Sequence, residues 1–232
     1  MKRVLLKLSG EALSASSGEI YDTSFVDEVA GAIKTCTDEG YQIAVVVGAG
    51  NIWRGRQGGD MDRTCADRMG MLATVINSMC LKDALERAGA RARVMTSISM
   101  EPFAEYYSAE NAVSALEAGE VVVLGGGLGI PFLSTDTAGA VRASEIGADA
   151  MLMAKNIDYI YTADPRVDKN AKKIENIKAS EVLALNLKAI DATATAFCMS
   201  VGMPIRVFGL KKPSDIILAV KGETVGTIIE AE

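Results

Sequence analysis

Near the first residue of the chain, a lysine, a serine and a glycine come directly after a short apolar run: Lys7-Leu8-Ser9-Gly10 follows Val4-Leu5-Leu6. A buried strand that ends in these residues can direct a fixed positive charge and bare backbone N–H groups toward a phosphate. The same residues would also suit an amphipathic edge strand with a solvated lysine. This segment alone favours neither interpretation.

Two further glycine-rich turns favour the phosphate interpretation. Gly48-Ala49-Gly50-Asn51 follows the apolar run 44–47, and Gly125-Gly126-Gly127-Leu128-Gly129 follows the apolar run 121–124. Runs that are apolar on both faces are typical of a covered parallel sheet, and ligands of open α/β sheets bind beyond the carboxyl ends of the strands. We therefore expect the three turns to line one cleft, although glycine can also serve only to allow a tight turn.

The familiar nucleotide-binding motifs do not fit these turns. Gly48-Ala49-Gly50 begins like GxGxxG, but the bulky Trp53 stands where the third glycine would allow close helix packing. The chain contains no GxxxxGK[ST] motif, which excludes an ordinary P-loop. Arg54 follows the second turn instead, where its guanidinium could hold phosphate oxygens with a fork of donors or simply lie on the surface.

Short β-branched runs alternate with longer helical patterns, which predicts parallel strands joined by crossover helices. The expected strands are Val4–Leu8, Gln42–Val47, Arg93–Met95, Glu120–Leu124, Ala150–Met153 and Ile205–Val207. The expected helices are Thr23–Glu39, Thr64–Ala88, Ser108–Ala118, Thr137–Ile146, Ala179–Leu185, Asp191–Val201 and Ser214–Val220. Ser134, Thr135 and Asp136 are all suited to N-cap the fourth helix, and segment 161–177 predicts a loop or short hairpin.

Composition limits the classes of function. The 232 residues, 49% hydrophobic and 23% charged, fit one large α/β domain or two closely fused lobes. A formal net charge of −6 counts against binding to nucleic acid or to an anionic membrane, so a phosphate site must be a local pocket of positive charge. Four cysteines without a CxxC pair, and no histidine, count against zinc and indicate reduced thiols in a cytoplasmic protein. No apolar stretch approaches ~18 residues, so we expect no membrane span.

Longer motifs follow one another along nearly the whole chain. They are Lys7-Leu8-Ser9-Gly10-Glu11-Ala12-Leu13, Gly50-Asn51-Ile52-Trp53-Arg54-Gly55, Asp67-Arg68-Met69-Gly70-Met71-Leu72-Ala73-Thr74, Pro131-Phe132-Leu133-Ser134-Thr135-Asp136, Tyr161-Thr162-Ala163-Asp164-Pro165, Pro204-Ile205-Arg206-Val207-Phe208 and Gly222-Glu223-Thr224-Val225-Gly226-Thr227. This series resembles the bacterial UMP kinases (uridylate kinases) of the amino-acid-kinase superfamily.

The resemblance implies transfer of the γ-phosphoryl of MgATP to UMP, giving UDP and ADP, in pyrimidine nucleotide biosynthesis. It implies a three-layer αβα sandwich with a mostly parallel central sheet. A single domain, residues 1–232, would bind the acceptor with its N-terminal part, about 1–135, and ATP with its C-terminal part, about 136–232. It further implies a cytoplasmic homohexamer activated by GTP and inhibited by UTP, with Mg²⁺ carried by ATP rather than by a metal site of the protein.

Roles follow from the resemblance by position. Lys7 would neutralise charge on the transferring phosphoryl, Arg54 would bridge phosphates, and Asp136 would orient Lys7 or organise the metal and its water; these three are the expected catalytic residues. Residues expected to bind ATP are Lys7, Leu8, Ser9, Gly10, Gly50, Arg54, Lys155, Tyr161 and Asp164. Residues expected to bind UMP are Ala49, Asp67, Leu128, Gly129, Ile130, Pro131, Phe132, Leu133, Ser134 and Thr135. From the residues alone, Asp136 could be only a helix cap and Asp67 only a solvated helix residue.

The chain departs from the family pattern at several of these positions. Ala49, Leu128 and Ile130 stand where the family usually has glycine, threonine and asparagine, and Met153-Ala154-Lys155-Asn156 replaces the usual Lys-Ala-Thr-Lys. Two alternatives therefore stay open: a sister kinase that phosphorylates a carbamate or a carboxylate, and a nucleotide-sensing regulator with an inactive site.

The segment 64–88 also suggests an interface. Its apolar residues offer more hydrophobic surface than one face of a sheet is expected to cover, and we expect it to contribute to a dimer within the hexamer. These residues are Met69, Leu72, Ala73, Ile76, Met79 and Cys80.

Overall fold

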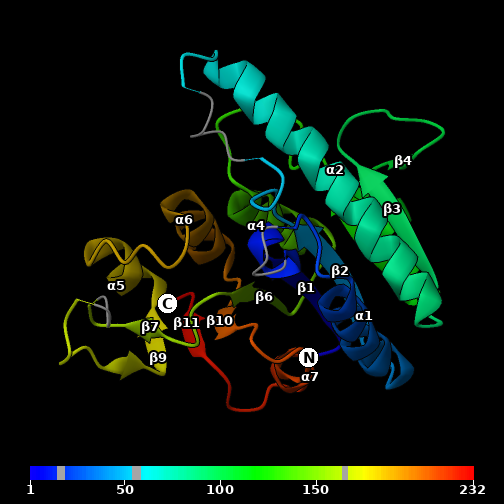
Figure 1. Ribbon diagram of the computed structural model, residues 1–232. Helices are drawn as coiled ribbons and strands as arrows, with labels where there is room; N and C mark the ends of the chain where they lie inside the picture. Colours follow the sequence, from blue (N-terminus) through cyan, green and yellow to red (C-terminus); the bar gives the residue numbers. More distant parts are fainter. Residues whose placement is uncertain (15–18, 54–58, 164–166) are drawn as a thin grey trace.

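The computed structural model describes residues 1–14, 19–53, 59–163 and 167–232. A nine-stranded sheet in the order β4-β3-β5-β2-β1-β6-β10-β11-β9 forms its centre (Figure 1). The strands are β1 (Arg3–Leu8), β2 (Gln42–Val47), β3 (Ala92–Thr96), β4 (Glu105–Tyr106), β5 (Val121–Gly125), β6 (Ala150–Lys155), β9 (Asn176–Lys178), β10 (Ile205–Gly209) and β11 (Thr227–Glu230). All neighbouring pairs run parallel except β10 and β11, which are antiparallel.

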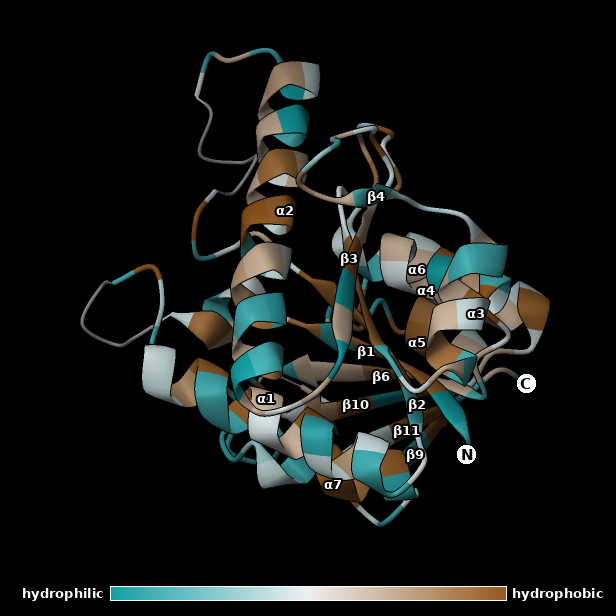
Figure 2. Ribbon diagram, turned by 90° about the vertical axis from the view of Figure 1, so that its right-hand side faces the viewer, coloured by the Kyte–Doolittle hydropathy of each residue, from teal (hydrophilic) through white to brown (hydrophobic). Residues whose placement is uncertain are grey.

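Helices cover both faces of this sheet (Figure 2). They are α1 (Thr23–Asp38), α2 (Arg63–Arg87), α3 (Ala109–Glu117), α4 (Thr135–Glu145), α5 (Ala179–Ala184), α6 (Ala192–Val201) and α7 (Ser214–Lys221). One hydrophobic core joins α1, α2 and α7 to Leu6 and Leu8 of β1, whereas the other joins α3, α4, α5 and α6 to Leu5. Because successive strand residues point to opposite faces, a strand that is apolar throughout is buried on both sides. The expected three-layer αβα sandwich is confirmed.

The sequence predicted the long elements well. All six expected strands and all seven expected helices are present, with ends within two residues of those predicted. The hairpin expected in segment 161–177 is present as the antiparallel pair β7 (Ile160–Tyr161) and β8 (Lys173–Ile174). The sequence did not predict β4, β9, β11 or the 3₁₀ turn η1 (Gly10–Leu13), because runs of two to four residues carry too little periodicity.

Strand order brings the glycine-rich turns together. β1 lies beside β2, which lies beside β5, and all three run parallel, so the turns after them lie at one edge of the sheet. The first two turns are in direct contact: a Cβ at Gly10 would lie 2.4 Å from the carbonyl oxygen of Gly48 and 2.7 Å from the nitrogen of Gly50. Only a residue without a side chain fits there.

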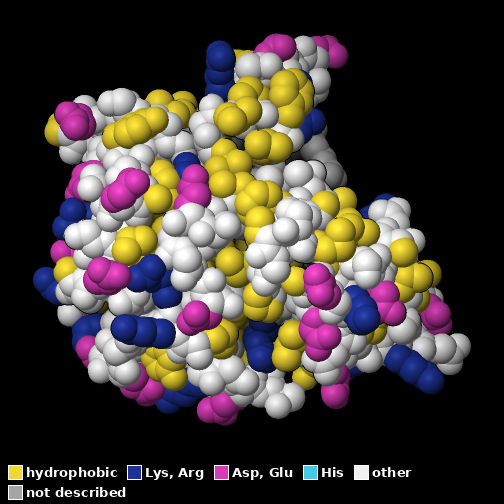
Figure 3. Space-filling model, turned by 180° about the vertical axis from the view of Figure 1, so that it is seen from behind, with side chains coloured by type: hydrophobic (Ala, Val, Ile, Leu, Met, Phe, Trp, Pro, Cys, Tyr) yellow, Lys and Arg dark blue, Asp and Glu magenta, His cyan; other side chains and the backbone are white. Residues whose placement is uncertain are grey.

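On the face shown in Figure 3, side chains of both charge signs are interspersed, and no broad basic patch covers it. Within the described ranges, no helix is both long enough and apolar enough to cross a membrane.

Candidate functional site

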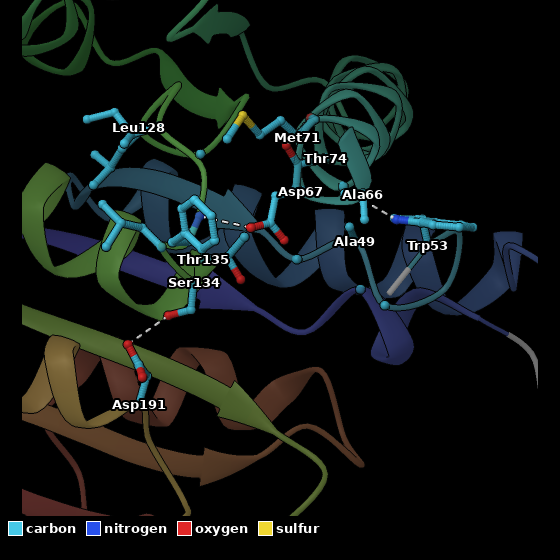
Figure 4. Close-up of a pocket in the computed structure, with 18 of the residues that line it drawn as sticks. Ala49, Trp53, Ala66, Asp67, Met71, Thr74, Leu128, Ser134, Thr135 and Asp191 are labelled. Atoms are coloured by element: carbon cyan, nitrogen blue, oxygen red, sulfur yellow. Dashed lines mark hydrogen bonds between the residues drawn. The ribbon is translucent and has the colours of Figure 1, made fainter. Parts of the chain in front are cut away.

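A cleft of about 540 Å³ opens at the carboxyl edge of the sheet (Figure 4). Gly10, Gly50 and Gly127 line it, one from each of the three glycine-rich turns, which confirms that these turns share one cleft. The N-terminal half of α2 contributes Asp67, and the N-terminus of α4 contributes Thr135. The cleft is therefore built from backbone turns and two helix segments rather than from a single loop.

An ion-pair group adjoins this cleft, which one of its members, Lys7, lines. Asp136 Oδ1 lies 2.7 Å from Lys7 Nζ, and Asp136 Oδ2 lies 2.7 Å from Lys155 Nζ. The side chains of Lys7, Asp136 and Lys155 are only 8%, 11% and 19% exposed. One carboxylate therefore holds two ammonium groups, and the buried group has a net charge of +1.

The fold explains how these three residues meet. Lys7 and Lys155 lie on the adjacent parallel strands β1 and β6, two residues apart in register because Lys7 pairs with Met153. Ser134 is the N-cap of α4, and its side chain accepts a hydrogen bond from Thr137 N. Asp136 thus lies in the first turn of α4, so the possibility that it is only a helix cap is wrong.

The electrostatics keep this group charged. Burial alone would raise the pKa of Asp136, but the charges of Lys7 and Lys155 outweigh it and lower the pKa to about 2. Burial lowers the pKa of Lys155, and the charge of Lys7 adds to this effect while Asp136 opposes it. Near neutral pH the carboxylate is therefore ionised and acts as a fixed anchor for positive charge.

Asp67 holds the loop between β5 and α4, residues 126–134, which we call the acceptor loop. Its carboxylate accepts hydrogen bonds from Arg63 Nε at 2.9 Å and from Phe132 N at 2.8 Å. Phe132 has a φ of 69°, an uncommon conformation for a residue other than glycine, and the Arg63 guanidinium carbon lies 5.7 Å from the centre of its ring. Asp67 is therefore not merely a solvated helix residue, because it ties the acceptor loop to α2.

The structure brings most of the expected site residues to the cleft. Of the residues expected to bind ATP or UMP, Lys7, Ser9, Gly10, Ala49, Gly50, Asp67, Leu128, Ile130, Phe132, Leu133, Ser134 and Thr135 line it. Gly129 and Pro131 lie in the same acceptor loop. The Leu8 side chain is fully buried in the core, so only its backbone could contact a ligand.

Tyr161 was also expected to bind ATP. Tyr161 lies in β7, where its hydroxyl donates a hydrogen bond to Asp158, and it is not among the described residues that line the cleft. Arg54 and Asp164 lie outside the described residues.

A second cavity of about 400 Å³ adjoins the first. Lys155 and Asp136 line it, together with Leu187 from the α5–α6 connection, whereas Lys7 lines the first cavity. Ser134 and Asp191 line both cavities. The ion-pair group therefore stands where two cavities meet, an arrangement that suits transfer of a charged group between two bound molecules.

Asp191 is a site residue that the sequence did not predict. Its carboxylate accepts hydrogen bonds from Ser134 Oγ at 3.0 Å and from Thr137 Oγ1 at 2.7 Å, so it joins the N-termini of α4 and α6 (Figure 4). The only signal in the sequence was its place at the start of an expected helix, which many aspartates share. Among the described residues no group of three or more acidic or cysteine side chains could hold a metal ion.

This chain is similar in sequence and structure to known proteins. The model of the amino acid kinase family matches residues 2–209. A UMP kinase from Bacillus anthracis is 36% identical, with a TM-score of 0.96 over 100% of this chain and 96% of that one. A UMP kinase from Ureaplasma parvum is 34% identical, with a TM-score of 0.93 over 99% of this chain and 98% of that one. A uridylate kinase from Archaeoglobus fulgidus is 29% identical, with a TM-score of 0.76 over 99% of this chain and 100% of that one. A match over most of its length, with a shared arrangement of strands and helices, means that this chain belongs to the amino acid kinase family.

Proposed function

We propose that this protein transfers the γ-phosphoryl of MgATP to UMP, giving UDP and ADP, a step of pyrimidine nucleotide biosynthesis. The observation that carries the proposal is the buried group in which Asp136 holds Lys7 and Lys155 where two cavities meet. Similarity to structures of two bacterial UMP kinases over nearly the whole chain supports the choice of acceptor.

This group suits the chemistry of phosphoryl transfer. The transition state is loose and spreads negative charge over the oxygens of the moving phosphoryl, so catalysis depends on positioning and on fixed positive charge. Lys7 supplies that charge in the first cavity, and backbone N–H groups of the glycine-rich turns add donors there. The acceptor of the reaction is an ionised phosphate, so no general base is required, and the chain has no histidine.

UMP and ATP enter the site from different cavities and meet beside Lys7. UMP binds in the part of the first cavity that α2 and the acceptor loop wall, and acceptor binding belongs to the N-terminal part, about 1–135. ATP approaches from the C-terminal part, about 136–232, where Lys155 lines the second cavity, and its phosphates reach Ser9, Gly10 and Gly50 in the first cavity. Mg²⁺ arrives bound to the ATP phosphates, since it keeps several waters and binds few protein carboxylates. Because Asp136 forms ion pairs with both Lys7 and Lys155, its role is to hold these two ammonium groups in position.

We propose that the protein assembles as a homohexamer through dimers that pack along α2. Leu72, Ile76 and Met79 of α2 are 48%, 51% and 42% exposed and are spaced to form one stripe on the helix. Ala73, which we expected on that surface, is buried, and Cys80 packs against the core. Activation by GTP and inhibition by UTP are proposed on the family resemblance alone, whereas a cytoplasmic location is proposed also because the four cysteines include no CxxC pair.

A coupled assay of ADP formation tests the proposed reaction. We expect UMP to be the best acceptor among UMP, CMP, dUMP, carbamate and acetylglutamate. Lys7→Ala should lower kcat by on the order of 10²-fold or more, because Lys7 acts on charge that develops in the transition state. Lys34→Ala, which removes a lysine paired with Asp38 on the surface of α1, is the matched control.

The acceptor assay also separates the alternatives. Turnover of carbamate or acetylglutamate in preference to UMP would identify a sister kinase of the family. Nucleotide binding without any turnover would identify a regulator with an inactive site.

A further inference from the structure

Ser97 makes three contacts with the turn that begins the acceptor loop. It follows β3 directly, and its N–H donates to the carbonyl oxygen of Gly125 at 3.3 Å. Its hydroxyl donates to the carbonyl oxygen of Gly127 at 2.6 Å. A Cβ at Gly129 would lie 3.2 Å from the carbonyl oxygen of Ser97, so the loop rests on the Ser97 backbone with no room for a side chain. The start of the acceptor loop is thus shaped against this one residue.

Arg142 fixes the direction of the Ser97 hydroxyl. Arg142 Nη2 lies 2.8 Å from Ser97 Oγ, and a guanidinium can only donate hydrogen bonds. The carbonyl oxygen of Gly127 can only accept, so the Ser97 hydroxyl proton must point at Gly127. The Gly127 carbonyl is therefore held toward Ser97.

A fixed carbonyl also fixes the next N–H. In a trans peptide the C=O of one residue and the N–H of the next point in opposite directions, so the Leu128 N–H points away from Ser97. Gly127 and Leu128 both line the cleft. Within the described ranges no group accepts a hydrogen bond from the Leu128 N–H. This donor is thus available to a molecule in the cleft.

Arg142 is itself held firmly. It is buried, and its Nη1 lies 2.6 Å from Glu145 Oε2. Its guanidinium carbon lies 3.7 Å from the centre of the Tyr107 ring, and the Tyr107 hydroxyl donates to the same Glu145 oxygen at 2.8 Å. Arg142 belongs to α4, the helix whose first turn carries Asp136. One rigid helix therefore sets the distance between the ion-pair group and the acceptor loop.

We propose that Ser97 is a positioning residue for the acceptor: held by Arg142, it turns the Gly127–Leu128 peptide so that the Leu128 N–H binds the acceptor nucleotide. This inference rests on the proposed function, in which UMP occupies the first cavity. It also explains how the site recognises its acceptor although Leu128 and Ile130 have no polar side chain to offer. The backbone supplies the hydrogen bond that those side chains cannot.

Kinetics of Ser97→Ala test the proposal. We expect the KM for UMP to rise about tenfold, the effect of losing one well-placed hydrogen bond, while kcat and the KM for ATP stay within about twofold. Ser200→Ala removes a hydroxyl that donates to a backbone carbonyl on α6, and it serves as the matched control. An unchanged KM for UMP in Ser97→Ala would overturn the proposal, and so would an equal change in all three constants.

Hydrogen exchange provides a readout that does not depend on turnover. In the wild-type protein UMP should slow exchange of amides in segment 125–135, and this protection should be lost in Ser97→Ala. Without UMP, exchange in that segment should be faster in Ser97→Ala than in the wild type. Equal exchange in the two proteins would overturn the positioning role. If the wild-type protein did not phosphorylate UMP, the proposed function would fail, while exchange without UMP would still decide whether Ser97 positions the loop.

Discussion

Replacing Asp136 with asparagine would test the ion-pair group most directly. Asp136→Asn keeps the shape of the side chain but changes the charge of the group from +1 to +2. The amide nitrogen of asparagine is a donor, so one of the two lysines would face a donor instead of an acceptor. Lys7 and Lys155 are both largely buried, so water can replace only part of the lost contact with the carboxylate.

The expected cost follows from that burial. Removing one partner of a buried ion pair typically costs about 3 to 5 kcal/mol, a large part of the roughly 5 to 15 kcal/mol by which domains are stable. The free energy of unfolding, measured with urea, should fall by about that amount. kcat should fall by on the order of 10²-fold, because the lysines would lose their fixed positions.

The dependence of stability on pH provides an independent test of this group. The pKa of Asp136 is lowered from 3.8 to about 2, so the stabilisation is present above pH 3.8 and is lost as the pH falls toward 2. This acid-labile part should be absent from Asp136→Asn.

A double-mutant cycle separates charge from shape. Adding Lys155→Met to Asp136→Asn returns the group to a net charge of +1, so the double variant should be more stable than Asp136→Asn by about 1 to 3 kcal/mol. Asp38→Asn, in a surface pair with Lys34, should change stability by less than about 0.5 kcal/mol. If Asp136→Asn unfolded within about 1 kcal/mol of the wild type, or if its effect and that of Lys155→Met were additive, our account of the group would be refuted.

Three further predictions concern other parts of the site and the surface. The lowered pKa of Lys155 means that kcat should begin to fall at a lower alkaline pH than an ordinary lysine would cause, and Lys155→Arg should move this limb upward in a pH–rate profile. Leu72→Glu together with Ile76→Glu should convert the assembly to a smaller species in light scattering, whereas a wild-type monomer at micromolar concentration would contradict the proposed interface. Ile130→Asn should leave the KM for UMP nearly unchanged, since we expect backbone recognition, and a tenfold lower KM would show that the side chain matters.

The long helices and strands could be predicted from the sequence, because the spacing of their apolar residues follows from which faces are buried. Residues 43–47 of β2 and the whole of β5 carry no polar side chain and are buried on both faces, and Ser134 caps α4 as its residue type predicts. β11 could not be recognised, because Thr227–Glu230 becomes a strand only by pairing with β10 and β9. Pairing of this kind depends on the folded sheet rather than on the segment itself.

In the candidate site too, some residues could be predicted from the sequence and others could not. Turns such as Gly10 and Gly50 stand out because the glycines follow apolar runs, and Lys7 precedes the first of them. The contact of Lys155 with Asp136 joins the end of a strand to the first turn of a helix, and no spacing in the sequence encodes it. Ser97 and Asp191 act through partners far away in the chain, so only the fold reveals them.

The position of the positive charge also determines how nucleotides reach the protein. The formal net charge is −6, so an approaching polyanion is repelled by the molecule as a whole and attracted only near the buried lysines. In physiological salt the Debye length is about 8 Å, which confines this repulsion to the vicinity of the surface. Added salt weakens the repulsion before it affects the buried ion pairs. Nucleotide capture here therefore tolerates ionic strength, unlike binding to an exposed basic surface, which salt progressively abolishes.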